Sequence, residues 1–385
     1  MTYLRKLYVR AFLCSLVSLL VTLTYIRLFE QELLDWNDYG TYTIARPFIP
    51  DTLFYLELVN TPEWDLTTLA ATNIKNGMAP ALLWGVANGD WYRMALISVI
   101  IAFVGLVYVA KICQHFSVPR LRALRAITLI GLLPAVWYFS VGSLKELPTM
   151  TALAGFFYHH VKRQNLASLL WGVLLVSIRF QLAAVLPLFV FASFYAKQPL
   201  RTSAIVLIIC SAAFPIFASL NILSLDVTAI FREQAGTESN LGAALENLRD
   251  TVPGVSAVVV GIRVVQSVLE PLAASFTEGF LFEAGIPSIL GFASLSTLLL
   301  TLPAWYRILV NIVRGLRTTL PLDIQRLYAL ILFYAVPVGG FSFIHGRYMF
   351  PLTALVVVGA IFRVRGRVPK RVRSNRLQPP RLAHT

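Results

Sequence analysis

The sequence predicts an all-α, polytopic membrane protein: a transmembrane helical bundle of about ten spans with a partly helical extracytoplasmic region. The first observation is composition, because only 14% of the 385 residues are charged, 57% are hydrophobic and the mean hydropathy is +0.70. A soluble domain of this length needs far more charge to cover its surface. The second is a series of apolar stretches near the length of a membrane span, and the third is the charge of the loops between them.

The apolar stretches define the predicted spans in chain order. A helix needs about 20 apolar residues to cross the hydrocarbon core. We place spans near residues 7–29, 90–112, 126–142, 147–161, 166–180, 182–196, 202–222, 284–306, 324–343 and 348–362. The first run is too long for a signal-peptide core and has no small-residue cleavage site, so we interpret it as a retained span.

The fifth and sixth spans are short, and one tilted helix over 166–196 is the alternative. Charge favours two helices. Lys162 and Arg163 precede this stretch, and Lys197 and Arg201 follow it. If both flanks are cytoplasmic, the segment must cross the membrane twice, as a hairpin that turns near Arg179.

The charge of the loops predicts the orientation. With both termini in the cytoplasm, only ten of the 33 basic residues lie outside, and every acid except Asp323 lies outside. We therefore expect a multi-pass membrane protein with its N- and C-termini in the cytoplasm; the resemblance described below implies that this membrane is the bacterial inner (plasma) membrane. The formal charge of +14 is concentrated in short loops and a basic tail, which indicates topology and contact with membrane lipids and no nucleic-acid partner.

One transmembrane domain, residues 1–363, is expected to carry two long outer loops, 30–89 and 223–283. Long ordered loops usually carry function. Within the second loop, an amphipathic run over 255–269 is expected to rest at the membrane interface and help to admit a lipid. The remaining segment, 364–385, is expected to be a disordered basic cytoplasmic tail attracted to anionic headgroups.

The candidate functional residues are ionisable or aromatic groups at the predicted outer ends of the spans. Ionisable groups at the hydrocarbon boundary are costly and tend to be functional. Several on one face of the membrane suggest a shared polar cavity. They are Asp35, Asp38, Lys145, Glu146, Arg179, Glu270, His345, Arg347 and Tyr348.

Asp35 and Asp38 are the candidate catalytic residues. A carboxylate at the membrane–water boundary can act as a general base on a hydroxyl or hold a metal. The alternative is that two acids after an outward span are only solvated. Neighbouring Trp36, Tyr39 and Tyr42 suit either an interfacial aromatic belt or stacking on sugar rings.

Lys145, Arg179 and Arg347 interrupt apolar context on the side where positive charge is disfavoured. Arginine offers a planar fork that suits phosphate, and lysine offers a point charge. A lipid-linked phosphate or pyrophosphate would supply the compensating anion, and Glu146 and Tyr348 belong to the same predicted binding set. The alternative is internal pairing, for example Lys145 with Glu146, or Arg179 with an outer-loop acid.

The histidines and the missing motifs narrow the chemistry further. His345 is a candidate phosphate donor or proton shuttle, with a structural hydrogen bond as the alternative. His159 and His160 are interpreted as interfacial. The sequence has no metal-ligand spacing, Walker loop, GxSxG or dinucleotide fingerprint. No metal site or cofactor is therefore indicated, although dependence on a divalent metal stays open, and a membrane-borne donor used outside the cell is favoured over an ATP-driven process.

In this layout the chain resembles bacterial multispanning glycosyltransferases that use polyprenyl-linked sugars. An acid soon after the first span, Asp35 or Asp38, is similar to the outer-loop carboxylate of C-type glycosyltransferases. Lys145-Glu146 followed by Arg179 resembles a pattern in O-antigen polymerases and other membrane proteins of surface-polysaccharide clusters. The segment from His345 through Arg347 and Tyr348 to Pro351 is similar to the Arg-Tyr…Pro opening of the last helices in those proteins.

The resemblance implies sugar transfer at the outer face of the plasma membrane in O-antigen or exopolysaccharide assembly, with undecaprenyl phosphate or pyrophosphate as leaving group. The implied partners are a lipid-linked donor, an acceptor and polysaccharide-assembly proteins. The chain lacks an O-antigen ligase signature and an Asp-rich metal motif, so polymerase versus single-sugar transferase stays open. A transporter or flippase of anionic lipid-linked sugars is the main alternative, and a non-catalytic scaffold is the third.

Overall fold

The computed structural model describes residues 2–28, 78–142, 145–179, 182–183, 185–219, 248, 252, 254–276, 282–283, 286–287, 289–318, 320–340 and 346–362. These residues are almost entirely helical. The only strand pairing among them is a two-residue ladder between β1 (Phe282–Glu283) and β2 (Ile286–Pro287). The predicted all-α class is confirmed for the part of the chain that is described.

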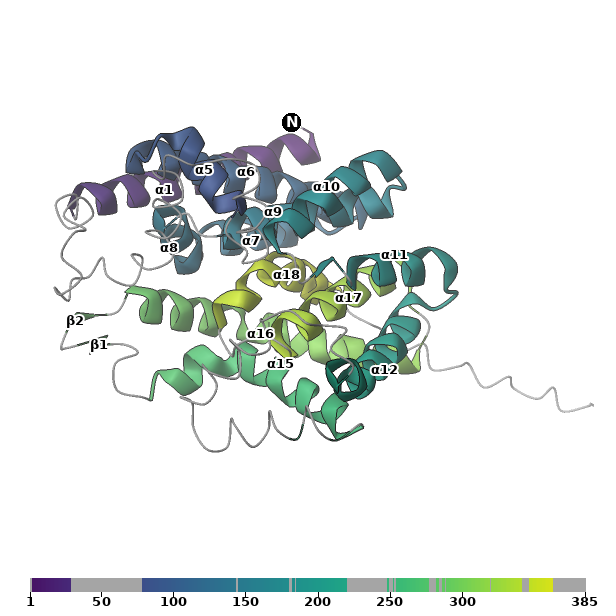
Figure 1. The fold of residues 1–385 in the computed structure, drawn as a ribbon. Coiled ribbons are helices and arrows are strands. Elements are labelled where there is room, and N and C mark those ends of the chain that lie inside the picture. The colour runs from purple at the N-terminus through teal and green to yellow at the C-terminus, as the bar shows by residue number, and fades with distance from the viewer. Residues whose placement is uncertain are drawn as a thin grey trace, which may run out of the picture.

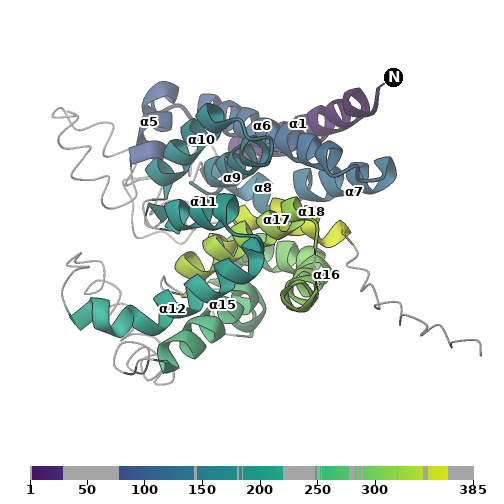
Figure 2. The same ribbon diagram turned by 90° about the vertical axis from the view of Figure 1, so that its right-hand side faces the viewer.

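The helices form two halves that pack on one another (Figure 1, Figure 2). The N-terminal half is made of α1 (Tyr3–Leu28), α5 (Met78–Ala87), α6 (Trp91–His115), α7 (Arg120–Gly131), α8 (Pro134–Gly142), α9 (Glu146–Val161) and α10 (Asn165–Ile178). The C-terminal half is made of α11 (Val185–Tyr195), α12 (Pro199–Ser219), α15 (Val255–Ala274), α16 (Ile289–Arg317), α17 (Leu322–Ala335), the π-helix η3 (Val336–Gly340), the 3₁₀-helix η4 (Gly346–Leu352) and α18 (Thr353–Ile361).

Apolar side chains on the outside of the bundle indicate contact with lipid. On α1, Phe12 and Leu20 are each 57% exposed, and on α10 Leu166 is 72% exposed. Soluble proteins rarely expose contiguous apolar surface of this kind. Five described helices are long and apolar enough to cross a membrane: α1, α6, α15, α16 from Gly291 onward, and α17 continued to Gly339. The chain thus has the features of an integral membrane protein.

The predicted number of ten spans is not established by these helices. α7 and α8 pass the same test together as a sixth span, bent by 43°, while α10, α11, the start of α12 and the segment Tyr348–Ile361 are shorter apolar helices. The bend in α7–α8 has a local cause, because Pro134 lacks an amide hydrogen and disfavours helical geometry in the residue before it. The freed amide of Ala135 donates to Thr297 Oγ1 at 3.1 Å.

The helix is interrupted at Arg179, as predicted. α10 ends at Ile178 and α11 begins at Val185, so the alternative of one continuous helix over 166–196 is wrong. That the two helices cross the membrane as a hairpin stays a prediction. The 255–269 run belongs to α15, which packs against α12, α16 and η3 and is itself long and apolar enough to cross a membrane. Its polar residues Ser256, Arg263 and Ser267 are buried, while Val258 and Val265 are more than half exposed. Its placement at the membrane interface stays a prediction.

The two ends of the bundle are chemically distinct. Glu146 opens α9 and His160 lies fourteen residues later in the same helix, roughly 20 Å away at about 1.5 Å per residue. The residues predicted to face outside, including Lys145, Glu146 and Arg179, gather at the first end. Asp323, which is predicted to face the cytoplasm, meets His115 at the other end. The face that each end presents to the cell stays a prediction.

Candidate functional site

The candidate site begins at the junction of α8 and α9. Lys145 directly precedes α9, and Glu146 is its first residue. A carboxylate in the first turn is favoured by the partial positive charge of the helix N-terminus. Pro148 is tolerated in this turn because its missing amide would have no helical partner there. Glu146 is 1% exposed, so the helix start presents its acid to the interior of the protein.

Arg179 reaches Glu146 from the end of α10. Its Nη2 donates to Glu146 Oε1 at 3.3 Å. Arg179 is 2% exposed and is one of the largest fully buried side chains. Internal pairing, which was the alternative to phosphate binding, is therefore observed for Arg179. Its partner is Glu146, however, and not an acid of the long outer loops.

Tyr348 completes the cluster from the C-terminal half. Arg179 Cζ lies 4.9 Å and Lys145 Nζ 5.8 Å from the centroid of the Tyr348 ring. Both distances are within the range of a cation–π interaction. Residues 145, 146, 179 and 348, which come from three separate turns, thus converge at one place as expected. What they bind stays a prediction.

Two atoms of the buried ion pair lack a hydrogen-bond partner among the described residues. They are Arg179 Nε, a donor, and Glu146 Oε2, an acceptor. Buried polar atoms are nearly always satisfied, and a charged group left unsatisfied is costly. The pair therefore offers one donor and one acceptor to a further group.

The other predicted site residues lie outside the described part of the chain. This applies to Asp35, Asp38 and His345, and to the side chain of Arg347, whose backbone lies in η4. Whether they join Arg179 and Tyr348 stays a prediction. Glu270 lies in α15, on a different element from the cluster.

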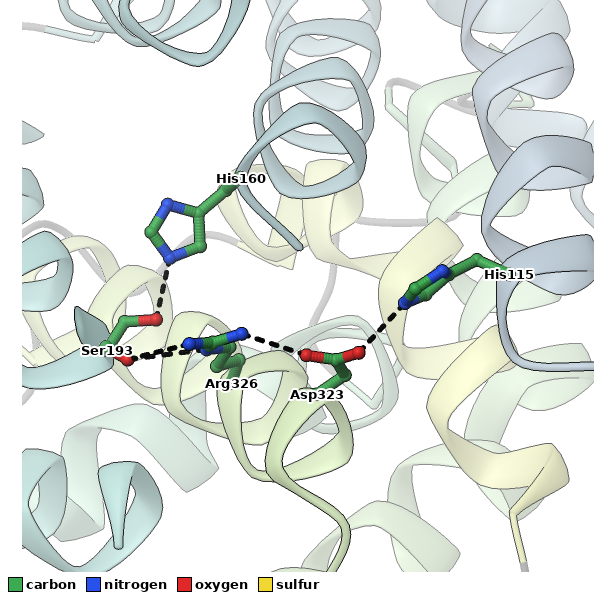
Figure 3. Close-up of polar contacts among 5 residues, drawn as sticks. All are labelled: His115, His160, Ser193, Asp323 and Arg326. Atoms are coloured by element: carbon green, nitrogen blue, oxygen red, sulfur yellow. Dashed lines mark hydrogen bonds and ion pairs between the residues drawn. The ribbon is translucent and has the colours of Figure 1, made fainter. Parts of the chain in front are cut away.

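A second polar cluster, which the sequence did not predict, lies at the opposite end of the bundle. Figure 3 shows five residues joined one to the next by polar contacts; they belong to α6, α9, α11 and α17. His115 Nε2 of α6 lies 2.9 Å from Asp323 Oδ2, and Arg326 Nη1 donates to Asp323 Oδ1 at 2.9 Å. Arg326 Nε and Nη2 both donate to the carbonyl of Ser193, at 3.3 and 3.2 Å. Ser193 Oγ in turn lies 2.6 Å from His160 Nε2.

This second cluster joins the two halves of the bundle. His115 and His160 belong to the N-terminal half, and the other three residues to the C-terminal half. His160 is 2% exposed, so it lies inside the protein and not on its surface. Its depth in the membrane stays a prediction. A cavity of about 550 Å³ borders the cluster, and His115, Arg163, Asp323 and Arg326 are among its lining residues. The sequence feature that could have indicated this second cluster is Asp323, the one acid on the predicted cytoplasmic side.

No group of three or more His, Cys, Asp or Glu residues suited to hold a metal ion occurs within the described ranges. The chain's cysteines are also separate, with Cys14, Cys113 and Cys210 all free thiols. Comparison with known proteins adds no family to this picture: no protein-family model, curated protein or solved structure matches the chain.

Proposed function

We propose that this chain is an integral membrane glycosyltransferase acting on polyprenyl-(pyro)phosphate-linked sugars at the outer face of the bacterial plasma membrane, in the assembly of a surface polysaccharide. The observation that carries the proposal is the buried Arg179–Glu146 pair with its donor and its acceptor unused. Its setting among apolar helices favours a ligand that arrives through the membrane.

A sugar phosphate complements these two atoms. A phosphate oxygen can accept a hydrogen bond from Arg179 Nε, because the planar guanidinium group matches the geometry of phosphate oxygens. A sugar hydroxyl can donate to Glu146 Oε2. A simple anion would satisfy only the arginine, and a neutral sugar would leave the arginine with no charged partner beyond Glu146. The pair therefore supports a ligand that has both groups.

The proposed reaction uses the cluster to stabilise the leaving group. An acceptor hydroxyl oxygen attacks the anomeric carbon, and the bond from that carbon to the phosphate oxygen breaks with its electrons remaining on the phosphate. Arg179, Lys145 and Arg347 stabilise the departing anion. Asp35 or Asp38 takes the proton of the hydroxyl. The ring of Tyr348, already in contact with two cations, helps to hold them in place.

The test is a reaction with the purified protein in liposomes, a synthetic polyprenyl-phosphate sugar and an oligosaccharide acceptor. A new glycosidic bond, detected by mass spectrometry, supports the proposal. Movement of the intact lipid between leaflets without a new bond would replace it with transport. If the protein forms no bond, moves no lipid and does not bind polyprenyl phosphate, both the transferase and the transporter are rejected. A non-catalytic scaffold is then the hypothesis that remains.

The two candidate bases are distinguished in the same assay. Asp35→Asn and Asp38→Asn each preserve shape but remove a carboxylate. Loss of transfer in one variant identifies the base, since the other then acts as an internal control. Full transfer in the double variant would contradict the role given to both.

A further inference from the structure

A cavity of about 290 Å³ lies between α1, α8 and α16, and none of its lining residues belongs to the Arg179 cluster. α8 packs against both of the other helices. Pro134, the first residue of α8, lines the cavity and begins the segment that bends by 43° from α7. The amide of Ala135 donates to Thr297 and so ties α8 to α16. The cavity is therefore built at a proline break and lies where the two halves of the bundle meet.

The walls of this cavity are aromatic and uncharged. Four aromatic side chains line it: Tyr25, Trp137, Tyr138 and Phe292. Among the described residues that line it, none carries a charge. Pockets for small molecules have volumes of roughly 300–1,000 Å³ and a few polar groups among apolar walls. The volume is near the lower end of this range, so the cavity suits one neutral ring better than a long chain or an anion.

Two polar atoms in the walls have no hydrogen-bond partner among the described residues. They are Trp137 Nε1 and Thr22 Oγ1, and the Thr22 side chain is fully buried. Buried hydroxyl and indole N–H groups are nearly always paired. Ser15 and Ser18 of α1 also have unpartnered hydroxyls, but they do not line the cavity. At Thr22 and Trp137 alone, an unused polar atom therefore coincides with space for a ligand.

A sugar ring fits these walls and these two atoms. A sugar oxygen can accept from the indole N–H of Trp137, and a sugar hydroxyl can donate to or accept from Thr22. The C–H groups on the faces of the ring can pack against the electron-rich faces of aromatic side chains. A lipid chain would leave both polar atoms unpaired, and a phosphate would meet no cation among the described lining residues.

The cavity also lies within reach of the Arg179 cluster. Val141 lines the cavity near the end of α8, and Lys145 follows four residues later in the chain. Four residues span at most about 14 Å when they are fully extended. A sugar in the cavity and a sugar phosphate beside Lys145 would thus be close enough to belong to one saccharide-transfer site.

We propose that this cavity binds a neutral sugar of the acceptor, with Thr22 and Trp137 as its hydrogen-bonding residues. The role as an acceptor site rests on the proposed function. The binding of a neutral sugar does not rest on it and can be measured without any transfer.

Binding is measured by ¹⁹F NMR of the protein labelled with 5-fluorotryptophan, in phospholipid nanodiscs because alkyl-glycoside detergents themselves carry a sugar. The probes are the methyl glycosides of glucose, galactose, mannose, rhamnose and N-acetylglucosamine. Trp137→Phe and Trp84→Phe identify the two signals by their loss. We expect at least one probe to shift the Trp137 signal and none to shift that of Trp84, whose Nε1 is also unpartnered but lies outside the cavity.

Thr22→Val tests the acceptor role, and Ser18→Ala is its matched control. Both hydroxyls are buried in α1 and unpartnered among the described residues, but only Thr22 lines the cavity. Removal of an unpaired hydroxyl is not expected to destabilise the fold. We expect Thr22→Val to raise the KM for the acceptor about fivefold, as for the loss of one hydrogen bond, with kcat and the unfolding temperature little changed. Ser18→Ala should change that KM less than about twofold.

A Trp137 signal that none of the five probes shifts would overturn the inference, and so would an equal rise in acceptor KM for Thr22→Val and Ser18→Ala. If the unsubstituted protein does not transfer sugar, the proposed function fails and the acceptor role fails with it. A shift of the Trp137 signal alone would then still establish a neutral-sugar site in this cavity. The two failures are thus distinguishable.

Discussion

The two ends of the bundle each contain a buried arginine paired with a carboxylate, and the two pairs differ in how completely they are satisfied. At one end Arg326 uses Nη1 for Asp323 and both Nε and Nη2 for the Ser193 carbonyl. At the other, Arg179 makes one bond of 3.3 Å to Glu146 and leaves Nε without a partner among the described residues.

The number of unused hydrogen-bonding atoms distinguishes a structural arginine from a ligand-binding one better than burial does, because both arginines are less than 5% exposed. A satisfied pair has nothing to offer a ligand and serves to join helices, here α11 and α17. An unsatisfied pair carries a cost that a ligand can remove by binding. We therefore predict a structural role for Arg326 and, in keeping with the proposed function, a binding role for Arg179.

The largest expected effect is on transfer and follows from Arg179→Lys. Lysine retains the charge that Glu146 requires but loses the planar fork, so the phosphate loses a directed donor. We expect kcat to fall by about 10²–10³-fold, as for removal of one donor to a developing anion, with the unfolding temperature little changed. Equal transfer by the variant and the unsubstituted protein would contradict the role of Arg179.

The next effect is on stability and follows from Arg326→Leu. The substitution leaves Asp323 with His115 alone and removes both donors to the Ser193 carbonyl. We expect the free energy of unfolding to fall by about 3 kcal/mol, the low end for a broken buried pair, because Asp323 is 31% exposed. Denaturant unfolding in micelles measures this change.

The folded fraction of Arg326→Leu should transfer sugar at the normal rate. If Arg326→Leu instead abolished transfer while the protein stayed folded, the division into a structural end and a binding end would fail. Arg326→Leu is also the matched control for Arg179→Lys, since both change a buried arginine at the interface of the two halves.

Much of this comparison could be anticipated from the sequence, and the rest could not for physical reasons. Loop charge predicted the break between two helices at Arg179, because the cost of placing charge in lipid acts on each segment separately. The pairing of Arg179 with Glu146 depends on how α9 and α10 pack, which no local pattern encodes.

The same reason explains what was missed. His160 and Ser193 lie in apolar runs without a sequence motif, and only the packing of α9 against α11 and α17 reveals their hydrogen bond. For α15, an amphipathic pattern shows that a polar face exists, while the pattern leaves open whether that face meets water or other helices; here Ser256, Arg263 and Ser267 of that face are buried.

Glu146→Gln should give an intermediate effect. Glutamine preserves the size of the side chain and can still accept from Arg179 through its amide oxygen, but it replaces the unused acceptor with an amide donor. We expect transfer to fall about tenfold while binding of plain polyprenyl phosphate, which has no sugar hydroxyl, stays within about threefold. Microscale thermophoresis and the transfer assay measure the two quantities. If transfer and the binding of polyprenyl phosphate fell to the same degree, the role of Glu146 would be only to hold Arg179 in place.

Lys145→Met should have the smallest effect of the four substitutions. It tests whether the burial of a charged side chain determines how much its loss reduces transfer. Methionine keeps most of the length of the side chain but removes the charge near the Tyr348 ring. Lys145 is half-buried, so solvent screens its charge more than that of Arg179. We expect about a threefold loss of kcat/KM that diminishes as salt is raised, whereas the loss in Arg179→Lys should persist at high salt because that site is buried. A larger loss for Lys145→Met than for Arg179→Lys would move the centre of the anion site from Arg179 to Lys145.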